Sequence, residues 1–152
     1  MTVADNKRAV LRSIETLWTH KDLEKLSSYL TPAFVSHRRV VARSAAGTLG
    51  PTRPVHGGPG DFIRAMDELV IAFPDAACAV DDIFGETDRI ALRWTLVGTH
   101  RSSHFGVPPT GKPITWRGAT ILRMDADGKM AESWTYSDDV SLLIQLGALA
   151  RR

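Results

Sequence analysis

Two adjacent aspartates, Asp138 and Asp139, stand where an alternating stretch gives way to an apolar helical pattern. The segment E-S-W-T-Y-S-D-D-V-S-L-L-I-Q-L-G, residues 132–147, predicts a strand that leads into a helix. One aspartate can cap that helix, because Asp is a favoured N-cap residue. The other is then a carboxylate without a structural task, and a carboxylate in an apolar pocket can work as a general acid and base.

The histidines are the next candidates. His37 follows the apolar pair Phe34 and Val35, where it is either a surface residue or a group that polarises a carbonyl and orients the acid. His100 and His104 have the spacing of metal ligands on a helix, but they fall at a strand end and in a loop. No acid or third histidine stands near them in the sequence, so we expect no metal site.

Four tryptophans are many for 152 residues, and aromatic walls would suit a flat, polycyclic ligand. Core packing accounts for at least two of Trp18, Trp94, Trp116 and Trp134. The chain has no phosphate-binding glycine loop, H-E-x-x-H zinc motif or G-x-S-x-G nucleophile turn. The stretch G-V-P-P-T-G-K at 106–112 predicts a rigid turn between strands.

The elements that must position these groups are helices first and strands afterwards. Helical periodicity predicts helices over about 5–19, over 23–30 behind a cap at Asp22, and from about 61 to Pro74. Strands are predicted over 77–84, 89–100, 113–124 and 130–136, in hairpin order. The Gly-, Pro- and Arg-rich connection 37–60 shows no period, so it is either a surface insertion or a lid over a pocket.

This order predicts an α+β fold: a conical barrel of a curved antiparallel sheet wrapped around N-terminal helices, with a C-terminal helix. Long strands indicate strong curvature, and the space between the concave face and the helices is where a small molecule would bind. We expect a single domain over residues 1–152.

Composition and charge narrow the function classes. With 19 Lys and Arg against 17 acids, the net charge of +2 gives no reason to expect nucleic acid or a membrane surface as a partner. Cys78 is the single cysteine, so no internal disulfide forms. The N-terminus has no apolar stretch behind its charges and no apolar run is long enough to span a bilayer, so we expect a cytoplasmic domain.

A family resemblance rests on motifs that come in a fixed order over nearly the whole chain. They are F-V-S-H (34–37), F-P-D (73–75), D-R-I-A-L-R (88–93), G-T-H (98–100), F-G-V-P-P-T-G-K (105–112), D-G-K (127–129) and E-x-W-x-x-x-D running on to Q-L-G (132–147). Together they resemble the SnoaL-like polyketide cyclases, or ester cyclases, of the nuclear transport factor 2-like superfamily. Each motif alone would be far less specific.

The resemblance implies a cofactor-free enzyme that closes a ring by an intramolecular aldol reaction. The family's acid–base aspartate, in W-x-x-x-D, matches Asp138, so Asp138 is expected to point into the pocket while Asp139 or Ser137 caps the helix. His37 is expected to assist it. Further expectations are a hydrophobic or aromatic small-molecule substrate and a homodimer or homotetramer. The expected substrate-binding residues are Trp18, His100, Trp116 and Trp134.

Two other readings stay open. One is a ketosteroid isomerase-like or epoxide hydrolase-like enzyme, the latter with an Asp-Arg-Asp relay in which Arg93 or Arg123 points inwards. Arg123 has a structural alternative, an ion pair with Glu132 across a hairpin. The other reading is a non-catalytic module that carries a hydrophobic small molecule.

Assembly can be predicted from the strands. Large apolar side chains occur on both faces of the 89–100 strand, with Leu92 and Leu96 on one face and Val97 on the other. In the 113–124 strand the adjacent residues Ile121 and Leu122 also point to opposite faces. A solvated sheet face would be more polar. Part of the outer face is therefore expected to be buried against a second subunit.

Overall fold

The computed structural model describes residues 1–43 and 49–149, and its helices and strands confirm the expected α+β class. The elements in chain order are α1 (Val3–Trp18), α2 (Leu23–Ser27), β1 (Leu30–Arg43), β2 (Leu49–Gly57), α3 (Pro59–Ala72), β3 (Ala77–Glu86), β4 (Arg89–Thr99), β5 (Pro113–Met124), β6 (Met130–Ser137) and α4 (Asp139–Gln145).

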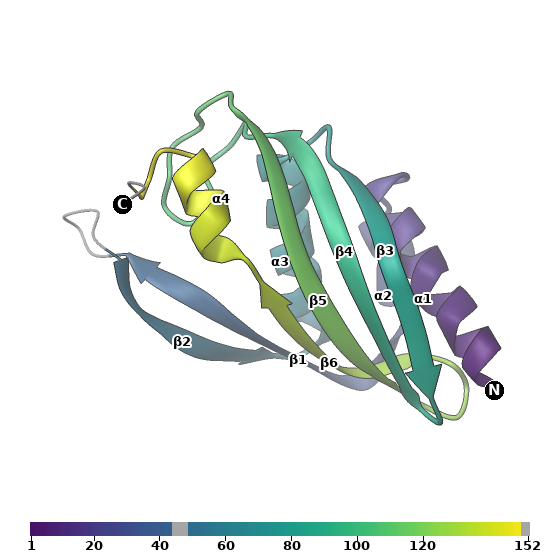
Figure 1. The fold of residues 1–152 in the computed structure, drawn as a ribbon. Helices are drawn as coiled ribbons and strands as arrows, with labels where there is room; N and C mark the ends of the chain where they lie inside the picture. The colour runs from purple at the N-terminus through teal and green to yellow at the C-terminus, as the bar shows by residue number, and fades with distance from the viewer. Residues whose placement is uncertain (44–48, 150–152) are drawn as a thin grey trace.

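The strands form one curved sheet in the order β2-β1-β6-β5-β4-β3 (Figure 1). β3 to β6 pair antiparallel in sequence order, as the hairpin pattern predicts. β1 pairs antiparallel with β2 but parallel with β6. The sheet is therefore mixed and open, where an antiparallel barrel was expected. A parallel pair needs a long crossover, here most of the chain, and short-range turn signals do not reveal it.

The connection 37–60, for which no strand was predicted, is largely a hairpin. β1 extends to Arg43, β2 starts at Leu49, and His37 stands opposite His56 in their register. Proline and glycine within β2 hid its strand signal, but β2 is an edge strand, where a missing backbone N–H is tolerated. The part of the predicted connection at 44–48 lies outside the described residues.

The helices follow their sequence signals more closely. α1 begins at a capping box in which the Thr2 hydroxyl accepts from the Asp5 backbone and the Asp5 carboxylate accepts from the Thr2 backbone. Its amphipathic pattern buries Val10 and Leu17. None of the described helices is long and apolar enough to cross a bilayer.

The helices α1, α2 and α3 lie on one face of the sheet, and α4 follows the end of β6 (Figure 1). Two apolar clusters join these layers. One gathers Phe73 of the α3 end with Leu96 and the α4 leucines, and the other packs Val10 of α1 against Ile90 and neighbouring strand residues. They hold the helices against the inner face and leave a cavity in between.

Candidate active site

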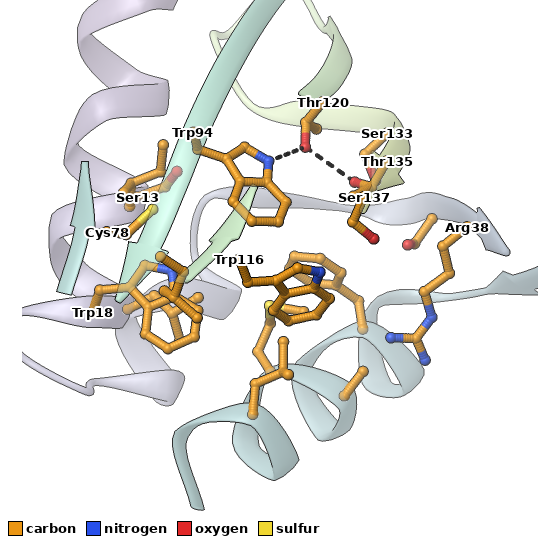
Figure 2. Close-up of a pocket in the computed structure, with 18 of the residues that line it drawn as sticks. Ser13, Trp18, Arg38, Cys78, Trp94, Trp116, Thr120, Ser133, Thr135 and Ser137 are labelled. Carbon is orange, nitrogen blue, oxygen red and sulfur yellow. Dashed lines mark hydrogen bonds between the residues drawn. The ribbon is translucent and has the colours of Figure 1, made fainter. Parts of the chain in front are cut away.

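A cavity of about 350 Å³ lies between the helices and the inner face of the sheet (Figure 2). Leu17 and Met66 line its helical side, and Leu92 and Leu96 line its sheet side. A volume of this order suits a small organic ligand. The mostly apolar walls make the few polar groups that face the cavity the candidates for chemistry.

Aromatic rings shape the cavity. Trp94 and Trp116 lie edge to face, with ring centroids 5.7 Å apart and planes at 89°. Trp18 lines the helical side. Trp18 and Trp116 were both expected near a substrate, and both lie on the wall; their part in binding stays a prediction. Rings in these orientations offer flat faces and edges to an aromatic ligand.

The Trp94 ring is fixed across the neighbouring strand. Trp94 of β4 stands opposite Gly118 of β5, and a side-chain carbon at Gly118 would lie 2.3 Å from the ring. The indole Nε1 donates to Thr120 Oγ1 at 3.2 Å, and Thr120 Oγ1 lies 3.1 Å from Thr135 Oγ1 (Figure 2). The absence of a side chain at Gly118 is therefore what lets this wall form.

A hydroxyl stripe runs along β6 on the cavity side. Ser133, Thr135 and Ser137 alternate with outward residues and all line the cavity. Ser133 Oγ is buried and finds no hydrogen-bond partner among the described residues. Buried hydroxyls are normally paired, so this one is available to a ligand.

Asp139 continues this stripe into the cavity. Ser137 Oγ donates to its Oδ1 at 2.7 Å, and Trp116 Nε1 donates to the same oxygen at 3.2 Å. Oδ2 has no partner among the described residues. Burial raises the pKa of Asp139, the neighbouring Asp138 charge adds to the rise, and the two hydrogen bonds oppose it. A carboxyl group with a raised pKa and one free oxygen can exchange protons with a bound molecule.

Asp138 takes the role that was expected of its neighbour. It is exposed and caps α4, and its carboxylate accepts from the Ser141 backbone at 3.0 Å. Its own backbone N–H donates to the Arg117 carbonyl, which extends the β5–β6 ladder by one residue. The alternation of β6 therefore continues, so that residue 138 faces out and residue 139 faces in. The expected placement of the two aspartates is wrong by one residue.

His37 and Trp134 lie on the outer face, not in the cavity. Every second residue of β1 from Phe34 to Val40 lines the cavity, including Ser36 and Arg38, whereas His37 does not, so His37 points away. Its ring stacks on Trp134 with centroids 5.3 Å apart. This corrects the expectation that His37 assists the acid and that Trp134 binds substrate. The reason is again the two-residue period of a strand.

On the outer face His37 has two polar neighbours. Its Nε2 is 2.7 Å from Glu132 Oε2, and its Nδ1 is 2.6 Å from His56 Nδ1. Glu132 also receives Arg123, which is the hairpin ion pair expected for this arginine. Arg93 is exposed and borders an outer hollow together with Asp138. Neither Arg93 nor Arg123 can then join an inward Asp-Arg-Asp relay.

His100 and His104 have different surroundings, and only His104 lines the cavity. His100 is completely buried, accepts from the Thr110 backbone at 3.2 Å, and does not line the cavity, which corrects its expected contact with substrate. His104 does line the cavity. Burial lowers the pKa of His104 to about 4, helped by the charges of His100 and Arg38. Within residues 1–43 and 49–149, no three His, Cys, Asp or Glu side chains are grouped so as to hold a metal ion.

Among the cavity residues that sequence reasoning did not place on the wall are His104, Arg38 and Cys78. The alternation that starts at Phe34 would have placed Arg38, had the strand been recognised. Burial raises the pKa of the Cys78 thiol to about 11, so this group stays protonated at neutral pH and supplies no thiolate nucleophile.

Comparisons with known proteins agree with this geometry. The family model of the SnoaL-like polyketide cyclases matches residues 8–146. AclR of Streptomyces galilaeus, a candidate hydroxylase, is 28% identical over 99% of this chain and 86% of its own, with a TM-score of 0.81. IdmH of Streptomyces antibioticus, a candidate polyketide cyclase, is 28% identical over 93% of this chain and 98% of its own, with a TM-score of 0.73.

A third solved structure supports only the likeness in fold. It is a candidate SnoaL-like polyketide cyclase from Jannaschia sp. CCS1, 23% identical over 96% of this chain and 94% of its own, with a TM-score of 0.77. No curated protein matches the chain.

Proposed function

Because the chain belongs to the SnoaL-like polyketide cyclase family, we propose that it is a cofactor-independent cyclase with Asp139 as acid and base. The reaction would be an intramolecular aldol ring closure of a polyketide-like carbonyl or ester compound. The observation that carries this proposal is the partly buried Asp139 carboxyl group on the cavity wall, with a raised pKa and with no hydrogen-bond partner for its Oδ2 among the described residues.

One carboxyl group is enough for the proton transfers. Ionised Asp139 would take a proton from a carbon that lies between two carbonyl groups. The carbanion would then attack a second carbonyl carbon of the same molecule, which forms the carbon–carbon bond and leaves an alkoxide. Asp139 would return its proton to that alkoxide. A raised pKa brings the acidity of the carboxyl group closer to that of the carbon acid that gives the proton and of the alcohol that receives it. Proton transfer in each direction is then easier.

The rest of the site would fold the substrate. Ser137 and Trp116 both hold Asp139 Oδ1, which fixes the direction of Oδ2. The hydroxyl stripe of β6 can bind the substrate oxygens, and the tryptophan rings can hold its flat parts. Keeping the reacting carbons in contact can contribute as much to the rate as the proton transfer itself.

Exchange of the two aspartates for asparagine tests the proposal. Asp139→Asn should lower kcat on an active substrate by roughly 10²- to 10⁴-fold, because it removes the general base and keeps the size of the side chain. Asp138→Asn is the matched control, since Asn also caps helices. Turnover would be followed by absorbance and mass spectrometry on a panel of aromatic polyketides. Unchanged turnover in folded Asp139→Asn would contradict the assignment.

The same panel separates the alternatives. Ring closure gives a product of unchanged mass, or one lighter by a water molecule. A ketosteroid isomerase-like activity gives an isomer without a new ring. A hydroxylase, the activity named for AclR, gives a product heavier by one oxygen atom. Quenching of tryptophan fluorescence without any product at any pH would favour a binding module.

A further inference from the structure

Arg38 is a cation on the cavity wall, and no acid among the described residues forms an ion pair with it. It projects inwards from β1 and is partly buried. Among the described residues it makes no hydrogen bond or ion pair, although the acids Glu68 and Asp139 also line the cavity. Figure 2 shows Arg38 at the opposite end of the cavity from Trp18, with Trp116 between them. Buried or half-buried charges are normally paired, so this one indicates a missing partner.

His104 adds a second unsatisfied group near Arg38. Its Nε2 is buried and has no hydrogen-bond partner in the part of the chain that the structure describes. Its ring is held among Phe73, Phe105 and Trp116, with centroids 5.6, 4.1 and 5.9 Å away. The charge of Arg38 is felt at this ring and contributes to its lowered pKa, so the imidazole is neutral at pH 7. A neutral imidazole with its proton on Nε2 is a hydrogen-bond donor.

These two groups fit a planar anion. A guanidinium offers two parallel N–H donors that match the two oxygens of a carboxylate, and it keeps its charge at every relevant pH. The imidazole can supply a further donor. A methyl ester has no charge to offer and would leave the guanidinium unneutralised inside the cavity.

We propose that the substrate carries a free carboxylate, bound by Arg38 and His104, at the Arg38 end of the cavity. The ring system would then lie against Trp116, whose indole also contacts Asp139, and the reacting carbons would reach Asp139. This placement of the reacting carbons rests on the proposed function. The anion subsite itself can be tested by binding alone.

The test compares three probes with the same ring: 2-naphthoate, methyl 2-naphthoate and 2-naphthyl phosphate, by isothermal titration at pH 7. A charge-assisted hydrogen bond should make wild-type protein bind the carboxylate at least about tenfold more tightly than the ester. Equal binding of acid and ester would overturn the proposal, and so would a clear preference for the phosphate. This comparison needs no variant and so does not depend on the folding of one.

Variants of Arg38 identify the residue responsible. Arg38→Met should reduce the preference for the carboxylate to about twofold or less and leave ester binding unchanged. Arg38→Lys should keep part of the preference, because it retains the charge but loses the planar fork. Arg93→Met on the outer face is the control and should behave as wild type. A preference that survives in folded Arg38→Met would overturn the role of Arg38.

Asp139→Asn distinguishes this inference from the proposed function. It should lose turnover and keep the preference for the carboxylate. If the preference is absent while Asp139→Asn still abolishes turnover, the carboxylate subsite is wrong and the cyclase proposal stands. If Asp139→Asn retains turnover while Arg38→Met loses the preference, the subsite stands and the acid–base assignment fails.

Discussion

At the scale of single residues, Asp139 links the proposed chemistry to stability. Burial raises its pKa above the value of about 4 that Asp has in an unfolded chain, so the folded protein holds this proton more tightly. Its contribution to stability is complete below that value and is lost as the pH rises through the raised pKa. The buried Asp139 carboxyl group therefore lowers the free energy of unfolding at neutral pH.

Asp139→Asn should show this loss directly. Relative to wild type, the variant should gain free energy of unfolding as the pH rises from 4 towards neutral, and the difference should level off above the raised pKa. Urea unfolding of both proteins at several pH values measures it. A difference that stays flat, or that changes in the opposite direction, would show that the carboxylate is not destabilised by burial.

The stability contribution of His104 depends on pH in the opposite direction to that of Asp139. Its pKa of about 4 in the folded protein lies below the usual value near 6.5, so its contribution to stability is complete above pH 6.5 and is lost as the pH falls towards 4. In NMR spectra its ring signals, identified by comparison with His104→Gln, should not titrate between pH 8 and pH 5. A midpoint near 6.5 would mean that the ring is solvated and would weaken its part in the anion subsite.

At the scale of elements, the contact between β4 and β5 sets the shape of the cavity. Gly118→Ala would place a carbon 2.3 Å from the Trp94 ring, so the ring must shift, which disturbs its hydrogen bond to Thr120. We expect a loss of roughly 1–3 kcal/mol in the free energy of unfolding, typical of overpacking, and weaker ligand binding.

The matched control for this substitution is Gly60→Ala in α3, where an added carbon meets nothing within 4 Å. It should be neutral or slightly stabilising, because alanine favours a helix more than glycine does. Urea unfolding and tryptophan fluorescence of the two variants measure the contrast. Gly118→Ala with wild-type stability and fluorescence would show that the wall can adapt.

Local signals sufficed for some elements and not for others. The periodicity of α1 and the turns that join β3 to β6 are local signals, since each depends on residues close together in the chain. The sequence therefore predicted these elements. The parallel pairing of β1 with β6 joins residues about a hundred positions apart, and nothing local encodes it. The hairpin of β1 and β2 was missed because glycine and proline obscure the pattern of an edge strand.

The candidate site was predictable to within one residue. The pair Asp138 and Asp139 was recognised, and Trp18 and Trp116 do line the cavity. For the strands that carry His37, Trp134 and the two aspartates, the face that points into the cavity was not recognised, because a shift of one residue turns every side chain to the other side. That single uncertainty misplaced Asp138, His37 and Trp134 together.

At the scale of the whole molecule, the outer face of the sheet carries a row of side chains that crosses all six described strands in register. From β3 to β2 the row is Phe84, Ala91, Ile121, Trp134, His37 and His56. Phe84 is 62% exposed and Ile121 41% exposed. Exposed apolar side chains gathered in one place on a sheet commonly mark an interaction surface.

We propose that this outer row is the interface of a homodimer. Arg89, whose guanidinium lies 5.4 Å from the Trp134 ring, and the Arg123–Glu132 pair flank the row and provide charges of both signs. A two-fold axis brings the same patch of two subunits together, so a patch with an apolar centre and mixed charges at its margin can complement itself.

Sedimentation equilibrium at micromolar concentration tests the dimer. Wild type should sediment with about twice the 16.7 kDa of one chain. Ile121→Glu should shift the equilibrium towards the monomer by at least tenfold, because it would bury an unpaired carboxylate at the centre of the interface. Ile71→Glu is the control, since Ile71 is 54% exposed on α3, away from the outer face, and should leave the dimer intact. A wild-type mass near that of one chain, or equal effects of the two substitutions, would remove the outer row as the interface.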